Sequence, residues 1–235
     1  MEDNRGVIRE FVNDSLVPQS VKLDNFPVYS NRQSIARFMA LEKLFEIQLP
    51  IKGSIVECGV FQGGGLFTYS HLSAIYEPSN YHRQIIGFDT FEGFPSWTDA
   101  DEIGVDKVGT FTPEYDTFIE LNLAARTFQA NQFIESKEKI RLIKGDANIT
   151  IPKFLDDNPY FICSMLYLDF DVYAPTKTAI EYFLPRMPKG AVIAFDEVHN
   201  PNWPGETQAL LETIGLSQLE LKCFPFDPHV AYAVL

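Results

Sequence analysis

The sequence has little cysteine, no long apolar segment and no excess of positive charge. Its three cysteines, Cys58, Cys163 and Cys223, are too few for a disulfide framework and indicate a reducing compartment such as the cytoplasm. No apolar run approaches the roughly 20 residues of a membrane-spanning helix. The opening segment, MEDNRGVIREFVNDS, lacks the basic and apolar regions of a secretory signal. We therefore expect a cytoplasmic protein with no membrane partner.

Positive charge is scarce, because 19 Lys and Arg stand against 32 Asp and Glu, a formal net charge of −13. Such a chain repels phosphate backbones, so we expect no nucleic-acid partner. Twenty Phe and ten Tyr among 235 residues supply enough apolar surface for a folded core. We predict a single domain over residues 1–235, with a helical N-terminal extension to about residue 50 and an acidic insert at about 97–120.

Short apolar runs alternate with amphipathic stretches, which is typical of an α/β sheet protein. The runs predict strands at 54–60, 84–90, 140–144, 161–170, 190–198, 219–226 and 229–235. Helices are expected at about 32–48, 64–76, 113–128, 151–157, 174–187 and 206–214. Thr112 and Pro113 form a typical helix start, with a capping hydroxyl and a proline at the first helical position.

The last two predicted strands are separated only by about Asp227 and Pro228, which is too short for a helical crossover. They must therefore pair antiparallel. Five parallel strands followed by a C-terminal antiparallel hairpin are the layout of the Rossmann-like class I methyltransferase sheet, with helices on both faces. A nicotinamide dehydrogenase is disfavoured, because its sheet is all parallel and the G-x-G-x-x-G fingerprint is missing.

Acidic residues follow three successive predicted strands in a pattern that suits a cationic nucleoside. Glu57 stands in the glycine-rich segment VECGVFQGGG, where it would attract an ammonium and repel a diphosphate. Asp89 can accept from ribose hydroxyls and Asp146 from an adenine amine, although an aspartate at a strand end is also a common helix cap. The implied cofactor is S-adenosylmethionine, and the residues expected around it are Glu57, Gly59, Phe61, Gly63, Gly64, Asp89, Thr90, Asp146, Ala147 and Asp169.

A second group of acids ends the fourth and fifth predicted strands. Asp169 and Asp171 belong to LDFD, and Asp196 and Glu197 to FDE. Neighbouring parallel strands bring these four carboxylates to one edge of the sheet, where their mutual repulsion calls for a cation. Mg²⁺ prefers such oxygen ligands. The alternative is that the four acids only cap helices and form turns.

Two further features have alternative interpretations. His199, near the end of the fifth strand, is either an ordinary loop residue or a catalytic or substrate-binding one. The interval 97–120 holds seven acidic residues against Lys107, and is either a solvated loop or a lid over the substrate. In the N-terminal extension, Tyr29 and Arg32 are candidates to line the site.

Three blocks of sequence give the chain a family resemblance: VECGVFQGGG, GFDTFEGFP and LDFDVYAPTKTAIEYFLPRMPKGAVIAFDE. They resemble the macrocin O-methyltransferase family of metal-dependent sugar O-methyltransferases. The resemblance covers about residues 30–235 and implies that Asp169, Asp196 and Glu197 bind Mg²⁺ while Asp171 acts as general base. The later acidic pair of that family is more usually Asp-Asp, so Glu197 is a departure.

The residues and the resemblance together predict an Mg²⁺-dependent O-methyltransferase acting on a sugar or a similar diol. Chelation of two substrate oxygens would lower a hydroxyl pKa and orient it toward the sulfonium methyl. The partner is then a small hydroxyl-bearing molecule, and a homo-oligomer is possible. Two rival functions stay open: methylation of a catechol-type phenol, and cofactor binding without turnover.

Overall fold

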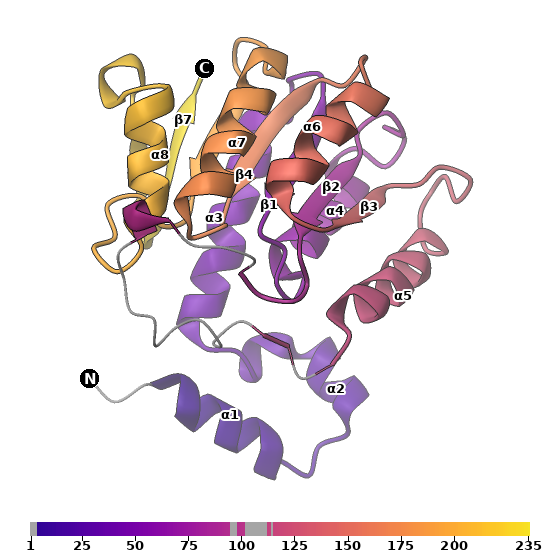
Figure 1. The fold of residues 1–235 in the computed structure, drawn as a ribbon. Helices are drawn as coiled ribbons and strands as arrows, with labels where there is room; N and C mark the ends of the chain where they lie inside the picture. Colours follow the sequence, from indigo (N-terminus) through magenta and orange to yellow (C-terminus); the bar gives the residue numbers. More distant parts are fainter. Residues whose placement is uncertain (1–3, 95–97, 102–111, 114) are drawn as a thin grey trace.

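A computed structural model describes residues 4–94, 98–101, 112–113 and 115–235. Its centre is a seven-stranded sheet in the order β3-β2-β1-β4-β5-β7-β6 (Figure 1). The strands are β1 Ser54–Cys58, β2 Ile85–Asp89, β3 Ile140–Lys144, β4 Cys163–Leu168, β5 Val192–Phe195, β6 Lys222–Phe224 and β7 Asp227–Val234. The first five run parallel, and β7 pairs antiparallel with both β5 and β6. This is the predicted fold.

The direction of chain progression reverses between β1 and β4, which are adjacent in the sheet. In open α/β sheets a ligand crevice forms at such a reversal, outside the carboxyl ends of the strands. β1 and β4 are buried along their whole length, as expected for parallel strands covered on both faces.

Helices cover the two faces of the sheet and make two separate cores (Figure 1). The helices α3 (Arg32–Gln48), α4 (Gly64–Tyr76) and α5 (Thr117–Gln129) pack on one face. The other face carries α6 (Ala147–Asp157), α7 (Tyr173–Phe183) and α8 (Gly205–Thr213). Short 3-10 turns are η1 (Phe26–Val28), η2 (Asp99–Asp101), η4 (Leu184–Arg186) and η5 (Leu216–Gln218).

Two helices precede this framework: α1 (Asn4–Asp14) and α2 (Gln19–Asp24). They lie beyond the carboxyl ends of the parallel strands, on the side of the crevice (Figure 1). Lys22 Nζ is buried and donates to the carbonyls of Val12 at 2.7 Å and Ser15 at 3.0 Å, while Phe11 stacks on Tyr29. These contacts fix α1 against the segment that leads into α3.

The strand predictions are confirmed in number and position, but three local predictions are wrong. The helix expected at 151–157 begins at Ala147, because Asp146 caps it there. The helix expected from Pro113 begins at Thr117, because the Asp116 carboxylate caps it by accepting from the Ile119 N–H at 3.0 Å. The hairpin turn lies at Pro225-Phe226 rather than at Asp227, which pairs with Phe224 inside the sheet. Buried Asp227 is held there by an ion pair with Arg37 at 3.0 Å.

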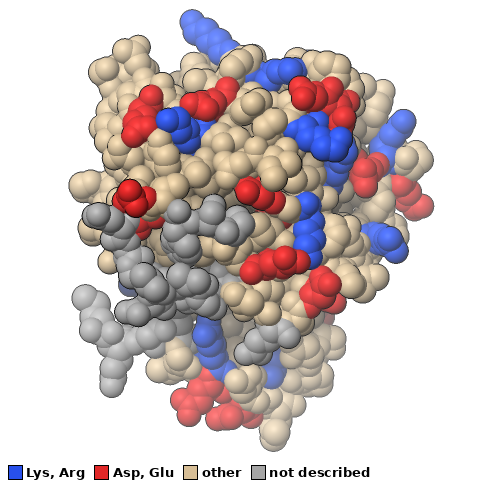
Figure 2. All heavy atoms as spheres, in the orientation of Figure 1, with Lys and Arg blue, Asp and Glu red and all other residues tan. Residues whose placement is uncertain are grey.

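The described helices include none that is long and apolar enough to cross a membrane. On the face shown in Figure 2, Lys and Arg side chains are scattered among Asp and Glu and form no single large patch. Cys58 and Cys163 are buried and Cys223 is exposed, and all three are free thiols.

Candidate active site

A cavity of about 280 Å³ lies at the carboxyl ends of the parallel strands. Most of the predicted site residues line it, together with an aromatic group made of Phe91, Phe94, Phe170 and Trp203. The predicted residues in its wall are Gly59, Phe61, Asp89, Thr90, Asp146, Ala147, Asp169, Asp171, Asp196 and Glu197. The sheet topology therefore brings together three strand ends predicted for the cofactor and two predicted for the metal.

Glu57 faces a second, adjoining cavity of about 680 Å³, which shares Asp169 with the first. Its side chain is buried, and Oε2 has no hydrogen-bond partner among the described residues. Burial, followed by the charge of Asp89, raises the pKa of Glu57 well above its ordinary value. An unpartnered buried carboxylate oxygen is costly, so it marks a place where a ligand cation is expected.

Glycines let the backbone approach this point closely. A Cβ on Gly65 would overlap Glu57 Oε1, and a Cβ on Gly59 would overlap the Asp169 carbonyl oxygen. Gly59 also adopts a φ of +91°, which favours glycine. Gly64 lines the second cavity beside Gly65, whereas Gly63 lines neither cavity and caps α4 in a left-handed conformation.

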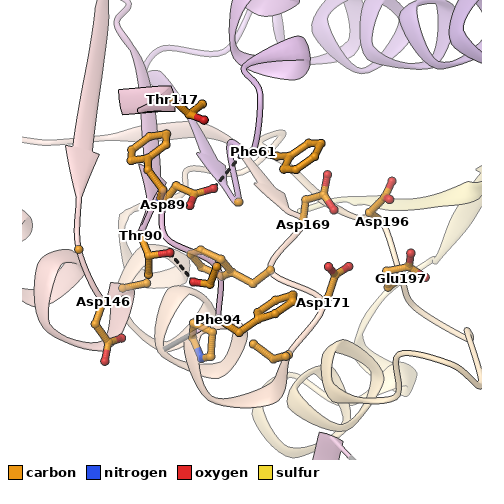
Figure 3. A pocket seen from close by; sticks show the side chains of 18 of the residues that line it. Phe61, Asp89, Thr90, Phe94, Thr117, Asp146, Asp169, Asp171, Asp196 and Glu197 are labelled. Carbon is orange, nitrogen blue, oxygen red and sulfur yellow. Dashed lines mark hydrogen bonds between the residues drawn. The ribbon is translucent and has the colours of Figure 1, made fainter. Parts of the chain in front are cut away.

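Asp89 organises the loop that follows β1. Oδ2 accepts from the N–H groups of Val60 and Phe61, both at 2.8 Å, and Oδ1 accepts from the Phe91 N–H at 2.7 Å. Figure 3 shows the contact with Phe61 at the edge of the first cavity. A carboxylate has about four acceptor sites, two on each oxygen, and these contacts use two on Oδ2 and one on Oδ1. The site left on Oδ1 is compatible with one predicted bond from a ribose hydroxyl.

Asp146 is the N-cap of α6, since Oδ1 accepts from the Asn148 N–H at 2.9 Å. The simpler of its two interpretations is therefore confirmed. Because Asp146 also lines the first cavity, its predicted bond to an adenine amine stays a prediction. The hydroxyl of Thr117, another cavity residue, is buried without a hydrogen-bond partner among the described residues and is a second polar atom available to a ligand.

The four predicted acids lie on the same side of the first cavity (Figure 3). Burial and then the charges of Asp196 and Asp171 raise the pKa of Asp169 well above its ordinary value. Asp171 holds a φ of +62°, which is sparsely populated for a residue with a Cβ. Phe61 and Phe91, in the same wall, share this left-handed backbone. Such conformations cluster where a fold over-determines the placement of a side chain.

Arg37 supplies positive charge to this cluster. Its guanidinium pairs with Asp196 and with Asp227, and it donates to the hydroxyl of Tyr167 at 2.8 Å. Tyr167 in turn donates to Asp196 Oδ1 at 3.0 Å. The sequence prediction missed Arg37, although it shares one helix face with Leu41 and Leu44, where a charged residue needs a buried partner.

Glu206, which the sequence prediction also missed, connects the two loops that carry the four acids. It is fully buried at the start of α8, and its two oxygens accept from the N–H of Asp171 at 3.3 Å and of Glu197 at 3.0 Å. Burial raises its pKa well above the ordinary value, and the nearby charges of Asp171 and Asp196 add to this. One carboxylate thus holds the backbone beside a predicted base and a predicted metal ligand.

Two other predicted features lie at the margins. His199 is exposed, lines neither cavity and donates its backbone N–H to Thr207 Oγ1 at 2.9 Å, so its catalytic role stays a prediction. Half of the acidic insert lies outside the described residues, and its proposed lid function stays a prediction. Within the described part, buried Asp101 accepts from the Tyr173 N–H at 2.6 Å and ties the insert to the start of α7.

Comparison with known proteins assigns the chain to a family. The family model described as macrocin O-methyltransferase (TylF) matches residues 34–209, three quarters of the chain. The chain belongs to the macrocin O-methyltransferase family. It is an S-adenosylmethionine-dependent O-methyltransferase. The resemblance inferred from the three sequence blocks is confirmed.

Solved structures agree with the family assignment. A crystal structure of CalS11, a calicheamicin methyltransferase, is 32% identical with a TM-score of 0.93, covering 97% of this chain and 90% of that one. The apo structure of CalS11, a TDP-rhamnose 3'-O-methyltransferase, is 30% identical with a TM-score of 0.84 and covers 97% and 92%. The O-methyltransferase NovP, at 19% identity and a TM-score of 0.60, covers 85% and 79% and shares the fold. A search of curated proteins found no match.

The site of this macrocin-family O-methyltransferase suits its cofactor, since unpartnered Glu57 Oε2 can receive the ammonium of a methionine moiety. The donor set of Asp169, Asp196 and Glu197 also suits a hard divalent cation, because all three offer carboxylate oxygens to one cavity. Over the described residues, no group of three or more His, Cys, Asp or Glu side chains is arranged to hold a metal ion. Two of the three carboxylates instead accept from side chains, Asp196 from Arg37 and Glu197 from Asn200.

Proposed function

We propose that the protein transfers the methyl group of S-adenosylmethionine to a hydroxyl of a sugar in an Mg²⁺-dependent reaction. The observation that carries this proposal is the convergence of four carboxylates on the first cavity, directly beside Glu57, whose Oε2 has no hydrogen-bond partner among the described residues. Together they provide a place for a cation-bearing cofactor and a set of oxygen donors around the acceptor.

The cofactor spans the two cavities in this proposal. Its adenosine occupies the first, where Asp89 and Asp146 face the ribose and the adenine and the aromatic wall packs on the base. Its amino-acid end extends to Glu57 in the second cavity, past Asp169, which borders both. The sulfonium is then next to the acidic cluster, whose negative charge favours it.

The acceptor class is inferred from CalS11, which acts on TDP-rhamnose and shares about a third of its residues with this chain over at least nine tenths of both. We infer that the acceptor here is also a sugar attached to a nucleoside diphosphate, with adjacent hydroxyls. A vicinal diol presents two oxygens at a spacing that carboxylates and a divalent cation can hold together.

Methyl transfer is an in-line displacement at carbon. The C–S bond of the sulfonium breaks as the C–O bond to the acceptor forms, and S-adenosylhomocysteine leaves as a neutral thioether. The acceptor hydroxyl must lose its proton, and Asp171 takes it on a carboxylate oxygen. The left-handed backbone of Asp171 and the bond from its N–H to Glu206 hold that carboxylate in the cavity wall.

Asp169, Asp196 and Glu197 would hold the metal ion. When bound, Mg²⁺ supplies a Lewis acid that lowers the pKa of a coordinated hydroxyl. Arg37 keeps Asp196 oriented and partly neutralised when the protein is free, which limits the cost of gathering like charges. Glu197 is one methylene longer than the aspartate usual in the family, and its backbone N–H is fixed by Glu206.

The proposal is tested by incubating the protein with S-adenosylmethionine and TDP-rhamnose, with Mg²⁺ or with excess EDTA, and identifying the product by mass and NMR. We expect a methylated sugar nucleotide whose formation stops with EDTA and returns with Mg²⁺. A catechol is run in parallel. Unchanged turnover in EDTA would overturn the metal requirement, and methylation of the catechol alone would overturn the sugar assignment.

A further inference from the structure

We propose that the outer wall of the second cavity binds the diphosphate of the acceptor through Arg9 and Arg32. This inference rests on the proposed function and adds a site for the part of the substrate that is not methylated. It starts from the distribution of charge: in a chain of net charge −13, this cavity gathers three arginines and a histidine, as many arginines as it has acids, which are Glu57, Asp169 and Asp227.

The cavity is large enough for more than one ligand group. Its volume of about 680 Å³ exceeds that of the first cavity, and Asp169 connects the two. Glu57, Gly64 and Gly65 form the inner wall, which the amino-acid end of the cofactor would occupy. The outer wall comes from α1, the start of α3 and the β6–β7 turn, and it stays open for the acceptor.

Two charged side chains of the inner part of the cavity have partners in the structure or in the proposal. Arg37 pairs with Asp196 and Asp227, and Glu57 would pair with the ammonium of the cofactor. In contrast, neither Arg9 nor Arg32 forms an ion pair with any residue in the described ranges, and both side chains are exposed to the cavity opening. Two arginines therefore remain for an anionic ligand.

The backbone beneath both arginines is held in place. Arg9 belongs to α1, which the Phe11–Tyr29 stack and the Lys22 bonds attach to the following segment. Arg32 is the first residue of α3, whose N-cap Asn31 accepts from the Ser34 N–H at 2.7 Å. The first turn of this 17-residue helix lines the cavity and adds the positive end of its dipole.

This chemistry matches a diphosphate. Guanidinium groups present paired N–H donors that bind phosphate oxygens in a bidentate manner, and two of them can share the charges of a diphosphate. The carboxylate of the cofactor is the other anion within reach of this cavity. It has one charge and lies beside Glu57, so the geometry favours the acceptor for the outer wall.

The test is isothermal titration of the full-length protein with S-adenosylhomocysteine, then of the saturated complex with TDP, with thymidine as the phosphate-free comparison. Arg9→Gln, Arg32→Gln and the control Arg126→Gln, an exposed arginine of α5 that lines neither cavity, are measured alongside. We expect the affinity for TDP to fall about tenfold or more in Arg9→Gln and in Arg32→Gln, and to stay unchanged in the control Arg126→Gln. The affinity for S-adenosylhomocysteine should stay unchanged in all three variants.

Each other result has a distinct meaning. Weaker S-adenosylhomocysteine binding with unchanged TDP binding would assign the arginines to the cofactor carboxylate and overturn the inference. TDP binding equal to that of thymidine, or insensitive to both substitutions, would overturn it as well. No binding of S-adenosylhomocysteine to the wild-type protein would instead be a failure of the proposed function itself.

Discussion

The two cavities meet at Asp169 but differ in charge and in origin. The first is lined by acids that follow strands of the sheet, whereas the outer wall of the second carries arginines from helices that precede the sheet. In the proposed reaction the sheet edge holds the reacting groups, and the N-terminal helices hold the charged remainder of the acceptor. Changes at the sheet edge should therefore affect the rate or the cofactor, and changes in the helices should affect the acceptor.

The largest effect is expected at Asp171. Asp171→Asn keeps the shape of the side chain but removes the proton acceptor, so kcat should fall by about 10²–10⁴. Initial rates with S-adenosylmethionine and TDP-rhamnose measure this change. Asp157→Asn, an exposed acid whose partner is Lys153, is the control and should leave the rate unchanged. An Asp171→Asn enzyme with full turnover would show that another group takes the proton.

Glu57 should control cofactor affinity rather than the chemical step. Glu57→Gln retains the volume but removes the charge that pairs with the ammonium, so the Kd for S-adenosylhomocysteine should rise about 10- to 100-fold. The same change removes a buried carboxylate whose Oε2 has no hydrogen-bond partner among the described residues, so the Tm of the ligand-free protein should rise. Titration calorimetry and thermal melts test both signs, and an unchanged Kd would remove Glu57 from the cofactor site.

The raised pKa of Glu57 also predicts a pH dependence. A carboxyl group whose pKa is higher in the folded protein than in the unfolded protein loses its proton at a lower pH in the unfolded state than in the folded state. The free energy of unfolding should therefore fall as pH rises above the ordinary glutamate pKa, until the raised pKa is passed. Denaturant melts of ligand-free wild type and Glu57→Gln between pH 4.5 and 8 should show a shallower fall in the variant. Equal slopes would mean that Glu57 keeps its ordinary pKa.

A substitution of Glu206 tests how much the rate depends on the positions of Asp171 and Glu197, because Glu206 holds their backbones and lines neither cavity. Two backbone N–H donors require two acceptor oxygens, and Glu206→Gln provides only one, so Asp171 or Glu197 loses its anchor. We expect kcat to fall about tenfold with an unchanged KM for S-adenosylmethionine. Glu212→Gln, an exposed glutamate of the same helix paired with Lys177, is the matched control. Equal effects of the two substitutions would reduce Glu206 to a general contributor to α8 stability.

The contrast between the cavities also explains what the sequence could predict. Strand ends are visible as apolar runs that stop at Asp89, Gly145 and Asp169, and parallel topology must bring them to one edge. Half of the residues that line the first cavity, including all of its acids, were accordingly predicted, whereas most of its aromatic wall was not. Arg9 lies in the predicted helical N-terminal extension, but no site role was predicted for it, because the position of α1 depends on contacts with a separate segment.

Competing local signals account for the remaining errors. Thr112 and Pro113 form a plausible helix start, but the Asp116 carboxylate caps the helix four residues later. Glu206 looks like an ordinary first-turn acid, and only the tertiary structure shows that it is buried under two loops. Local patterns specify elements well, but they do not specify which polar side chains those elements will bury.

The smallest effect is expected at Asp146, where it distinguishes a helix cap from a cofactor ligand. Asp146→Ala and Asp116→Ala each remove an N-cap aspartate, and each should lower the free energy of unfolding by about 1 kcal/mol. Asp146 also lines the first cavity, whereas Asp116 lines neither. If Asp146 accepts from the adenine amine, only its variant should weaken S-adenosylhomocysteine binding, by about three- to tenfold. Equal affinities in the two variants would limit Asp146 to its role in starting α6, and the adenine would then depend on the aromatic wall and on other polar atoms such as Thr117 Oγ1.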